Sequence, residues 1–164
     1  MDLQQEIALA ENWLNRRSTE EIRENQEYFD AFQFLRQAHM DGTLPADVPK
    51  TVTDALVEPL PHLLSRLTED RAMNGQTLCL RSGFLQARIN VLLDDEPPTK
   101  EEALVLSLTL SLDLRGLRKL LALCGYRLEE ATADLLAEYC VRHEKWDTGL
   151  YRSLLETFTA EVQP

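Results

Sequence analysis

The sequence of 164 residues is poor in several features that define whole classes of protein. It has only three cysteines, Cys79, Cys124 and Cys140, and so sparse and odd a set is not a disulfide framework. Its richest apolar run, residues 103–112, contains serine and threonine and is too short to cross a bilayer. The N-terminus lacks the basic and then apolar pattern of a signal peptide. We therefore expect a cytoplasmic protein of a reducing compartment, with no membrane segment.

The motifs of common enzyme active sites are absent from the sequence as well. There is no G-x-S-x-G, no phosphate-binding loop and no G-x-G-x-x-G dinucleotide motif. None of the three histidines follows a glutamate at the Glu-x-x-His spacing of helix-bundle iron sites. Cys140 and His143 lie one helical turn apart, but a zinc site needs further ligands in a fixed geometry. We therefore predict that the protein is not an enzyme and has no metal, no cofactor and no catalytic residues.

Basic residues are scarce, because 17 Lys and Arg stand against 28 Asp and Glu, which gives a net charge of −11. A uniformly acidic surface repels phosphate, so a nucleic acid is not the default partner. The acidic excess is confined to the two ends of the chain, since residues 63–125 carry eight basic and eight acidic groups. The middle third is therefore the part of the chain that opposes nucleic-acid binding least.

What the sequence does contain is a succession of amphipathic segments that predict an all-α fold. Helical spacing of apolar residues begins at Leu3, and again after STEE at Ser18–Glu21, which has the form of a capping box. Prolines are then concentrated before residue 62, although a short helix within Thr51–Glu58 is compatible with the sequence. We divide the chain into an N-terminal helical extension (1–41), a Pro-rich linker (42–60), a helical core (61–126) and a C-terminal helical hairpin packed on that core (127–164).

The segment from Leu104 to Leu114 allows two interpretations. Leucine occupies every second position, and this period of two indicates a strand. However, the run follows a second capping-box sequence, TKEE at Thr99–Glu102, and leucine forms helices more readily than strands. Leucines at every second position of a helix point all round it. We therefore predict a central helix that is buried on all sides.

The second predicted helix is rich in aromatic rings. Tyr28, Phe29, Phe32 and Phe34 cover more than one of its faces. Such a set belongs to a core or to a helix–helix contact more often than to a ligand site. Four large rings in seven residues also indicate that this helix docks against something sizeable, including a second copy of the chain.

The middle and C-terminal parts of the chain carry an ordered set of family motifs. The sequence TLCLRSGFLQARINVLLDDEPPTKEEALVLSLTLSLDLRGLRKLLALCGY resembles the lambda-repressor-like helix-turn-helix family of small bacterial and phage regulators. The Leu-Cys pair at Leu78 matches the Leu-Ala pair of the family's second helix, and Gly83 matches its turn glycine. The Ile-Asn pair at Ile89 matches the Ile-Ser/Asn pair of its recognition helix. The likeness covers about residues 61–158, including the C-terminal helices.

This resemblance implies a helical bundle that contains a helix-turn-helix and acts as a DNA-binding regulatory protein. The recognition helix would present Gln86, Arg88 and Asn90 to base edges in the DNA groove. Arg81 and Lys100 would contact phosphates. Regulators of this kind combine two DNA-binding heads, so a homodimer is expected as well.

Departures from the family pattern oppose DNA binding, among them Gly75 at the start of the second helix of the motif, where the family has Gln. The family has Ser or Thr directly after the turn, where it binds phosphate, and this chain has Leu85. Asp94, Asp95 and Glu96 place three acids at the edge that would dock on DNA, which weakens the electrostatic part of the affinity. The alternative is a helix-turn-helix that serves as a protein–protein interaction or adaptor module and does not bind DNA. The contact residues expected for that module are Phe84, Leu85, Tyr28, Phe29 and Phe32.

Overall fold

The computed structural model describes residues 2–94 and 96–162, and the fold of this part is all-α, as the sequence predicts. Within it, no strand is formed, and no helix combines the length with the apolar character needed to cross a membrane. In chain order the helices are α1 (Leu3–Asn15), α2 (Thr19–Asp41), α3 (Lys50–Val57), α4 (Leu60–Asp70), α5 (Gly75–Ser82), α6 (Gln86–Asp94), α7 (Lys100–Thr109), α8 (Leu114–Leu123), α9 (Thr132–Arg142) and α10 (Thr148–Val162).

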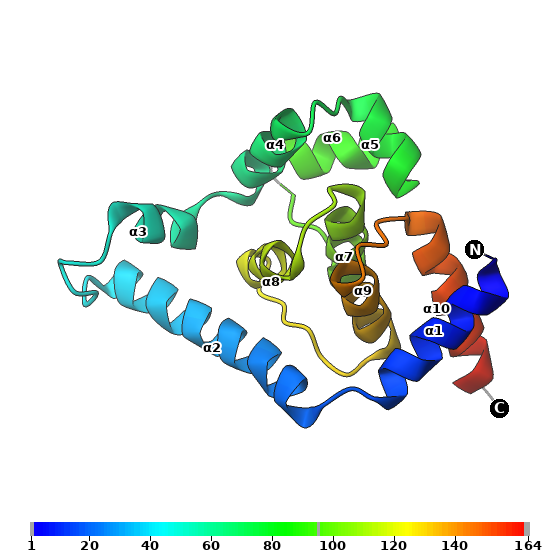
Figure 1. Cartoon of the computed structure of the whole chain (residues 1–164). Coiled ribbons are helices and arrows are strands. Elements are labelled where there is room, and N and C mark those ends of the chain that lie inside the picture. The colour runs from blue at the N-terminus through cyan, green and yellow to red at the C-terminus, as the bar shows by residue number, and fades with distance from the viewer. Residues whose placement is uncertain (1, 95, 163–164) are drawn as a thin grey trace.

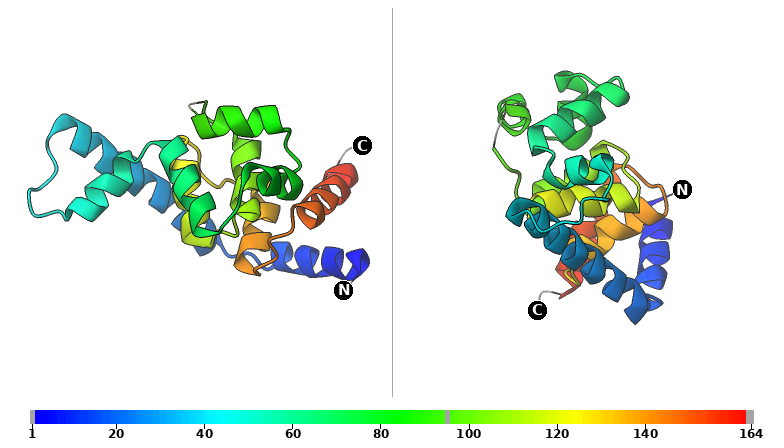
Figure 2. Two further views of the ribbon diagram at one scale, coloured as in Figure 1. Left: turned by 90° about the horizontal axis from the view of Figure 1, so that it is seen from above. Right: turned by 90° about the vertical axis from the view of Figure 1, so that its left-hand side faces the viewer.

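Helices α7, α8 and α9 form the centre of the molecule, and the other helices surround them (Figure 1). Helices α4, α5 and α6 cover one end, whereas α1 and α10 lie together against α9 on another side. Helix α2 lies along α8 and then continues with α3 beyond the body of the molecule as an arm (Figure 2). The N-terminal helices therefore pack on the same body as the C-terminal pair α9 and α10.

Helix α7 is the most deeply buried element, since every residue from 103 to 109 is buried. Its capping box is complete, because the amide N–H of Glu102 donates to Thr99 Oγ1 at 3.2 Å and that of Thr99 donates to Glu102 Oε1 at 2.9 Å. The hydroxyls of Ser107 and Thr109 donate to carbonyls one turn earlier, so their burial leaves neither hydroxyl unpaired. The prediction of a helix rather than a strand is thus confirmed for residues 100–109. It is wrong for the last part of the leucine run, since the helix ends at Thr109 and Ser111 has a φ of +54° in the turn before α8.

Local signals also explain where other helices begin and end. Ser18 caps α2 by accepting the amide N–H of Glu21 at 3.2 Å, and Gly42 ends that helix with a φ of +75°. The compatible short helix of the proline-rich segment is formed as α3, which lies between Pro49 and Pro59. These termini depend on neighbouring residues, which is why the sequence predicts them.

Three apolar clusters hold the helices together. The largest joins α1 to α7, α8, α9 and α10 and includes Ala10, Leu108 and Leu154. A second joins α4, α5 and α6 to α7 and α8 through residues such as Ile89 and Leu110. The third attaches α2 and α3 to α8 and has only three buried members, Phe32, Leu56 and Ala122. The arm is therefore held by much less apolar contact than the rest of the fold.

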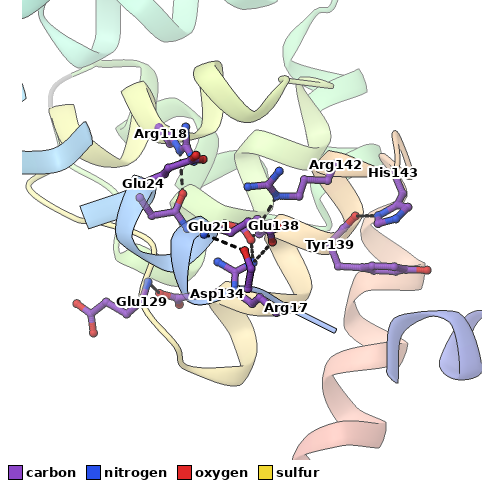
Figure 3. A network of polar contacts seen from close by, with 12 residues as sticks. Arg17, Glu21, Glu24, Arg118, Glu129, Asp134, Glu138, Tyr139, Arg142 and His143 are labelled. Carbon is purple, nitrogen blue, oxygen red and sulfur yellow. Dashed lines mark hydrogen bonds and ion pairs between the residues drawn. The ribbon is translucent and has the colours of Figure 1, made fainter. Parts of the chain in front are cut away.

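A buried polar network attaches the first half of α2 (Figure 3). At its centre is Glu138 of α9, whose side chain is only 1% exposed. Glu138 pairs with Arg17, with Arg142 at 3.4 Å and with the amide of Asn25, which donates to Oε1 at 2.5 Å. Arg118 of α8 donates to the other end of the same amide at 2.8 Å. One carboxylate thus connects α2, α9 and the chain between α1 and α2.

The three cysteines are free thiols. Burial raises the pKa of both Cys124 and Cys140 to about 12. These two side chains are therefore protonated at neutral pH and are poor nucleophiles and metal ligands. His143, one turn after Cys140, is engaged differently, since its Nδ1 lies 2.9 Å from the carbonyl oxygen of Tyr139.

Candidate interaction site on α5 and α6

Helices α5 and α6 are joined by a short turn that requires glycine at its first position. Gly83 has a φ of +78°, and a Cβ there would lie 2.7 Å from Nη1 of Arg152 in α10. The hydroxyl of Ser82 donates to the carbonyl of Leu78 and accepts the amide N–H of Phe84 at 3.1 Å. Arg152 also donates to the carbonyl of Ser82. The angle between the two helices is therefore set by the turn and by α10 together.

The inner face of this helix pair belongs to the core. Leu78 of α5 and Ile89 and Leu92 of α6 are each at most 3% exposed. They pack with residues of α4 and α7, including Leu64 and Leu106. Because one face of α6 is buried in this way, its opposite face is presented to solvent. The exposed residues of that face are Gln86, Ala87, Asn90 and Val91.

Arg88 lies at the edge of the exposed face, and its guanidinium is bound by two carboxylates. Its Nε and Nη2 each donate to Glu102 at 2.6 Å, and its Nη1 lies 3.0 Å from Glu96. The hydrogen bonds that Arg88 donates to Glu102 raise the pKa of Arg88, and the same bonds lower the pKa of Glu102. Two carboxylates thus surround one guanidinium, and the local charge of this group is negative.

The exposed amides of α6 are bonded within the chain. Gln86 donates to the side-chain oxygen of Asn90 at 2.8 Å and accepts the thiol proton of Cys79 at 3.3 Å. A Cβ at Gly75 would lie 3.1 Å from Nε2 of Gln86, so the glycine there leaves room for this arrangement. Contact with a base edge would require these amides to exchange their present partners.

The two cations expected at phosphates have different surroundings. Lys100 pairs at 2.6 Å with Asp134, a carboxylate that is 4% exposed and also accepts the amide N–H of Glu129 at 2.7 Å. This pair ties the start of α7 to α9, so Lys100 is engaged in the fold. Arg81, by contrast, is exposed in the last turn of α5. Of the expected phosphate contacts, only Arg81 is presented to solvent.

Large apolar side chains are also exposed on this helix pair. Leu80 of α5 is 80% exposed, and Leu85 in the turn is 79% exposed. Phe84, beside Leu85, is half-buried and packs against two of the apolar clusters, so it belongs to the core as much as to the surface. The turn between α5 and α6 therefore presents the aliphatic side chain of Leu85 to solvent.

The aromatic residues of α2 lie elsewhere. Tyr28 and Phe32 have stacked rings with centroids 6.2 Å apart, and together with Phe29 they pack in the cluster that attaches α2 and α3 to α8. Only Phe34 is strongly exposed, at 73%. The expected contact residues thus form two separate groups, one on α2 and one at the α5–α6 turn.

The contacts that decide the charge of the site are not visible in the sequence pattern. Glu102 is recognisable as the N3 residue of a capping box, yet its contact with Arg88 depends on how α6 and α7 pack. Of the acids expected at this edge, Asp94 is exposed at the end of α6 and Glu96 pairs with Arg88, whereas Asp95 lies outside the described residues.

Comparisons with known proteins identify no matching family model, no similar curated protein and no similar solved structure. The site must therefore be interpreted from its own chemistry.

Proposed function

We propose that this chain is a protein–protein interaction module of the adaptor type, in which α5, the turn and α6 form a helix-turn-helix scaffold that binds a partner protein and not DNA. The observation that supports this most is the pairing of Arg88 with both Glu102 and Glu96. Arginine is the side chain that most often reads guanine. Arg88 is the one arginine of α6, and it already forms a bidentate pair with Glu102.

Transfer of Arg88 from its carboxylates to a base would add little to the free energy of DNA binding. The guanidinium would exchange a bidentate carboxylate for a bidentate base edge, so the number of its hydrogen bonds would stay the same. Glu102 and Glu96 would then face the phosphates without a counter-charge. With Lys100 held by Asp134 and a net charge of −11, few cations are available to displace counterions from DNA.

The exposed leucines suit a protein partner. Burial of exposed apolar side chains against a partner removes them from water, which favours association. Leu80 and Leu85 are such side chains, and the acids Asp94, Glu96 and Glu101 are exposed on the neighbouring segments. A complementary partner has an apolar patch surrounded by basic residues. A second copy of this acidic chain lacks that complementarity, so we favour a different protein.

DNA reading is the second candidate function, and one observation favours it. The face that carries Gln86, Ala87 and Asn90 is open to solvent. Amide side chains can pair with adenine, and alanine can contact a thymine methyl group. This face would read DNA if the hydrogen bonds to a suitable base sequence were at least as favourable as the present bonds of the amides within the chain.

Site-specific photo-crosslinking in cells of the source organism tests the proposal. A photoreactive amino acid replaces Leu85, and the matched control carries it at Leu3, which is 44% exposed on α1. We expect one protein to crosslink from position 85 and not from position 3, with a yield that Leu80→Ser lowers by about fivefold. Crosslinks to nucleic acid alone, or the same products from both positions, would contradict the proposal.

A further inference from the structure

A pocket of about 270 Å³ lies where α1 meets the C-terminal end of α9. Three aromatic rings, those of Trp13, Tyr139 and His143, form part of its wall. Arg16 and Lys145 line it as well. The pocket has no lining residue in common with α5 or α6, so it is independent of the interaction site proposed above.

The rings of the pocket are held in place by their neighbours. The Trp13 centroid is 5.7 Å from that of Tyr139 and 6.2 Å from that of His143, with the last pair perpendicular. The guanidinium of Arg17 lies over the Trp13 ring at 5.1 Å, and Nδ1 of His143 lies 2.9 Å from the carbonyl of Tyr139. A site whose side chains are already ordered loses little entropy when a ligand binds.

Two cations, Arg16 and Lys145, line the pocket, in contrast to the acidic character of the whole chain. No carboxylate is among its lining residues, whereas Arg16 is exposed at the end of α1. Lys145 donates to Glu6 at 2.6 Å and to the hydroxyl of Tyr139 at 2.9 Å. Burial alone would lower the pKa of Lys145, but these two bonds outweigh it and raise the pKa, so the ammonium group is charged at neutral pH. Because Glu6 pairs with Lys145, the net positive charge at the pocket comes from Arg16.

We infer that this pocket binds a small molecule made of a planar aromatic ring with an anionic group attached. The ring packs against Trp13 and His143, where aromatic contacts favour offset or edge-on arrangements. The anionic group is bound by Arg16 through charge-assisted hydrogen bonds, and by the one ammonium proton of Lys145 that neither Glu6 nor Tyr139 accepts. A volume of about 270 Å³ is slightly below that of sites for drug-sized ligands, which favours a ligand with one ring system. A nucleoside monophosphate and an aromatic carboxylic acid share this chemistry.

Tryptophan fluorescence of the full chain tests the inference. The chain has two tryptophans, so Trp13 is the only reporter in a Trp146→Phe background. Adenosine monophosphate is titrated against adenosine, and benzoate is titrated against benzyl alcohol. We expect at least one of the two anions to change the Trp13 emission saturably and to bind about tenfold more tightly than its neutral counterpart. Calorimetric titration of the unmutated chain with the same compounds checks that Trp146→Phe has not altered the pocket.

Two arginine variants decide whether the pocket itself is responsible. Arg16→Ala removes an exposed side chain and should weaken binding of the anion about tenfold. Arg115→Ala removes an exposed arginine of α8 that does not line the pocket, and it should leave binding unchanged. Binding of only one anion identifies the ligand as a nucleotide or as an aromatic acid. Equal binding of the charged and neutral compounds, equal effects of the two variants, or no binding of either anion would overturn the inference.

Discussion

Two clusters of arginine and glutamate in this molecule have similar composition but opposite consequences. In the first, Arg88 at the edge of α6 is paired with Glu102 and Glu96 near the surface. In the second, Glu138 pairs in the interior with Arg17 and Arg142 (Figure 3). Exposed ion pairs contribute little to stability because water competes for both partners. Buried pairs are costly to break because the remaining charge has no solvent to compensate it.

The buried cluster acts on the positions of the helices, whereas the surface cluster acts on binding. The cluster around Glu138 connects α2 to the centre of the fold. Because few apolar contacts hold α2, this cluster has its main effect on stability. The cluster around Arg88 determines which charge α6 presents, so it has its main effect on binding. Variants of each cluster should therefore change one property much more than the other.

The largest effect is expected at the buried cluster. Glu138→Gln removes, at nearly constant volume, the buried charge that pairs with Arg17 and Arg142, and it leaves Arg17 with only the more distant Glu21 at 3.7 Å. It should lower the free energy of unfolding by about 3–5 kcal/mol. Urea denaturation measures this loss. Glu129→Gln is the matched control, since the side chain of Glu129 is 57% exposed, and it should change the free energy by less than about 0.5 kcal/mol. Similar losses in both variants would remove the distinction between the two kinds of pair.

A third carboxylate, Glu58, is intermediate in exposure between Glu138 and Glu102. Its contribution to stability can be tested by varying the pH. Burial alone would raise its pKa, but hydrogen bonds from Arg66, Lys119 and His62 outweigh burial and lower the pKa to about 2. Its contribution to stability is therefore complete above pH 4.5, the ordinary value, and is lost as the pH falls toward 2.

The Glu58→Gln variant isolates this contribution from that of the other carboxylates. After allowance for solvent screening, wild type should lose about 2 kcal/mol more than the variant as the pH falls through this range. Denaturation curves at several pH values measure the difference. Parallel pH profiles for the two proteins would show that the ion pairs of Glu58 do not stabilise the fold.

The smallest effect on stability, and the largest on binding, is expected at the surface cluster. Glutamine can replace glutamate in a capping box, so Glu102→Gln combined with Glu96→Gln should cost less than about 1 kcal/mol. The same double variant frees Arg88 and should raise the affinity for duplex DNA at low salt by about tenfold, with a steeper salt dependence. Unchanged DNA binding would show that the pairing of Arg88 does not limit it.

Most of the fold could be predicted from the sequence because its signals are local. Ser18 and Thr99 cap helices through the residues that follow them, and Gly83 allows the turn between α5 and α6. The capping box at Thr99 also resolved the ambiguous alternation of leucines in favour of a helix. A single residue or a short spacing is enough to recognise each of these features.

The charge of the candidate site could not be predicted, because it depends on contacts between distant residues. Arg88 and Lys100 have the residue type that binds DNA, and only packing reveals that Glu102 and Asp134 already hold them. Glu138 is a similar case, since its position in the sequence gives no indication that it is buried. Residue type thus indicates what a side chain can do, whereas the fold decides which side chains are available to do it.

The most direct test of the proposed function is a titration of the unmutated protein with DNA at low salt, after selection from a random pool. If α5 and α6 bind a protein, no sequence should be enriched, and the residual binding should be equally weak for Arg88→Ala and Asn90→Ala. Enrichment of one sequence, bound with a steep salt dependence and lost in either variant, would contradict the account and establish α6 as a DNA-reading helix.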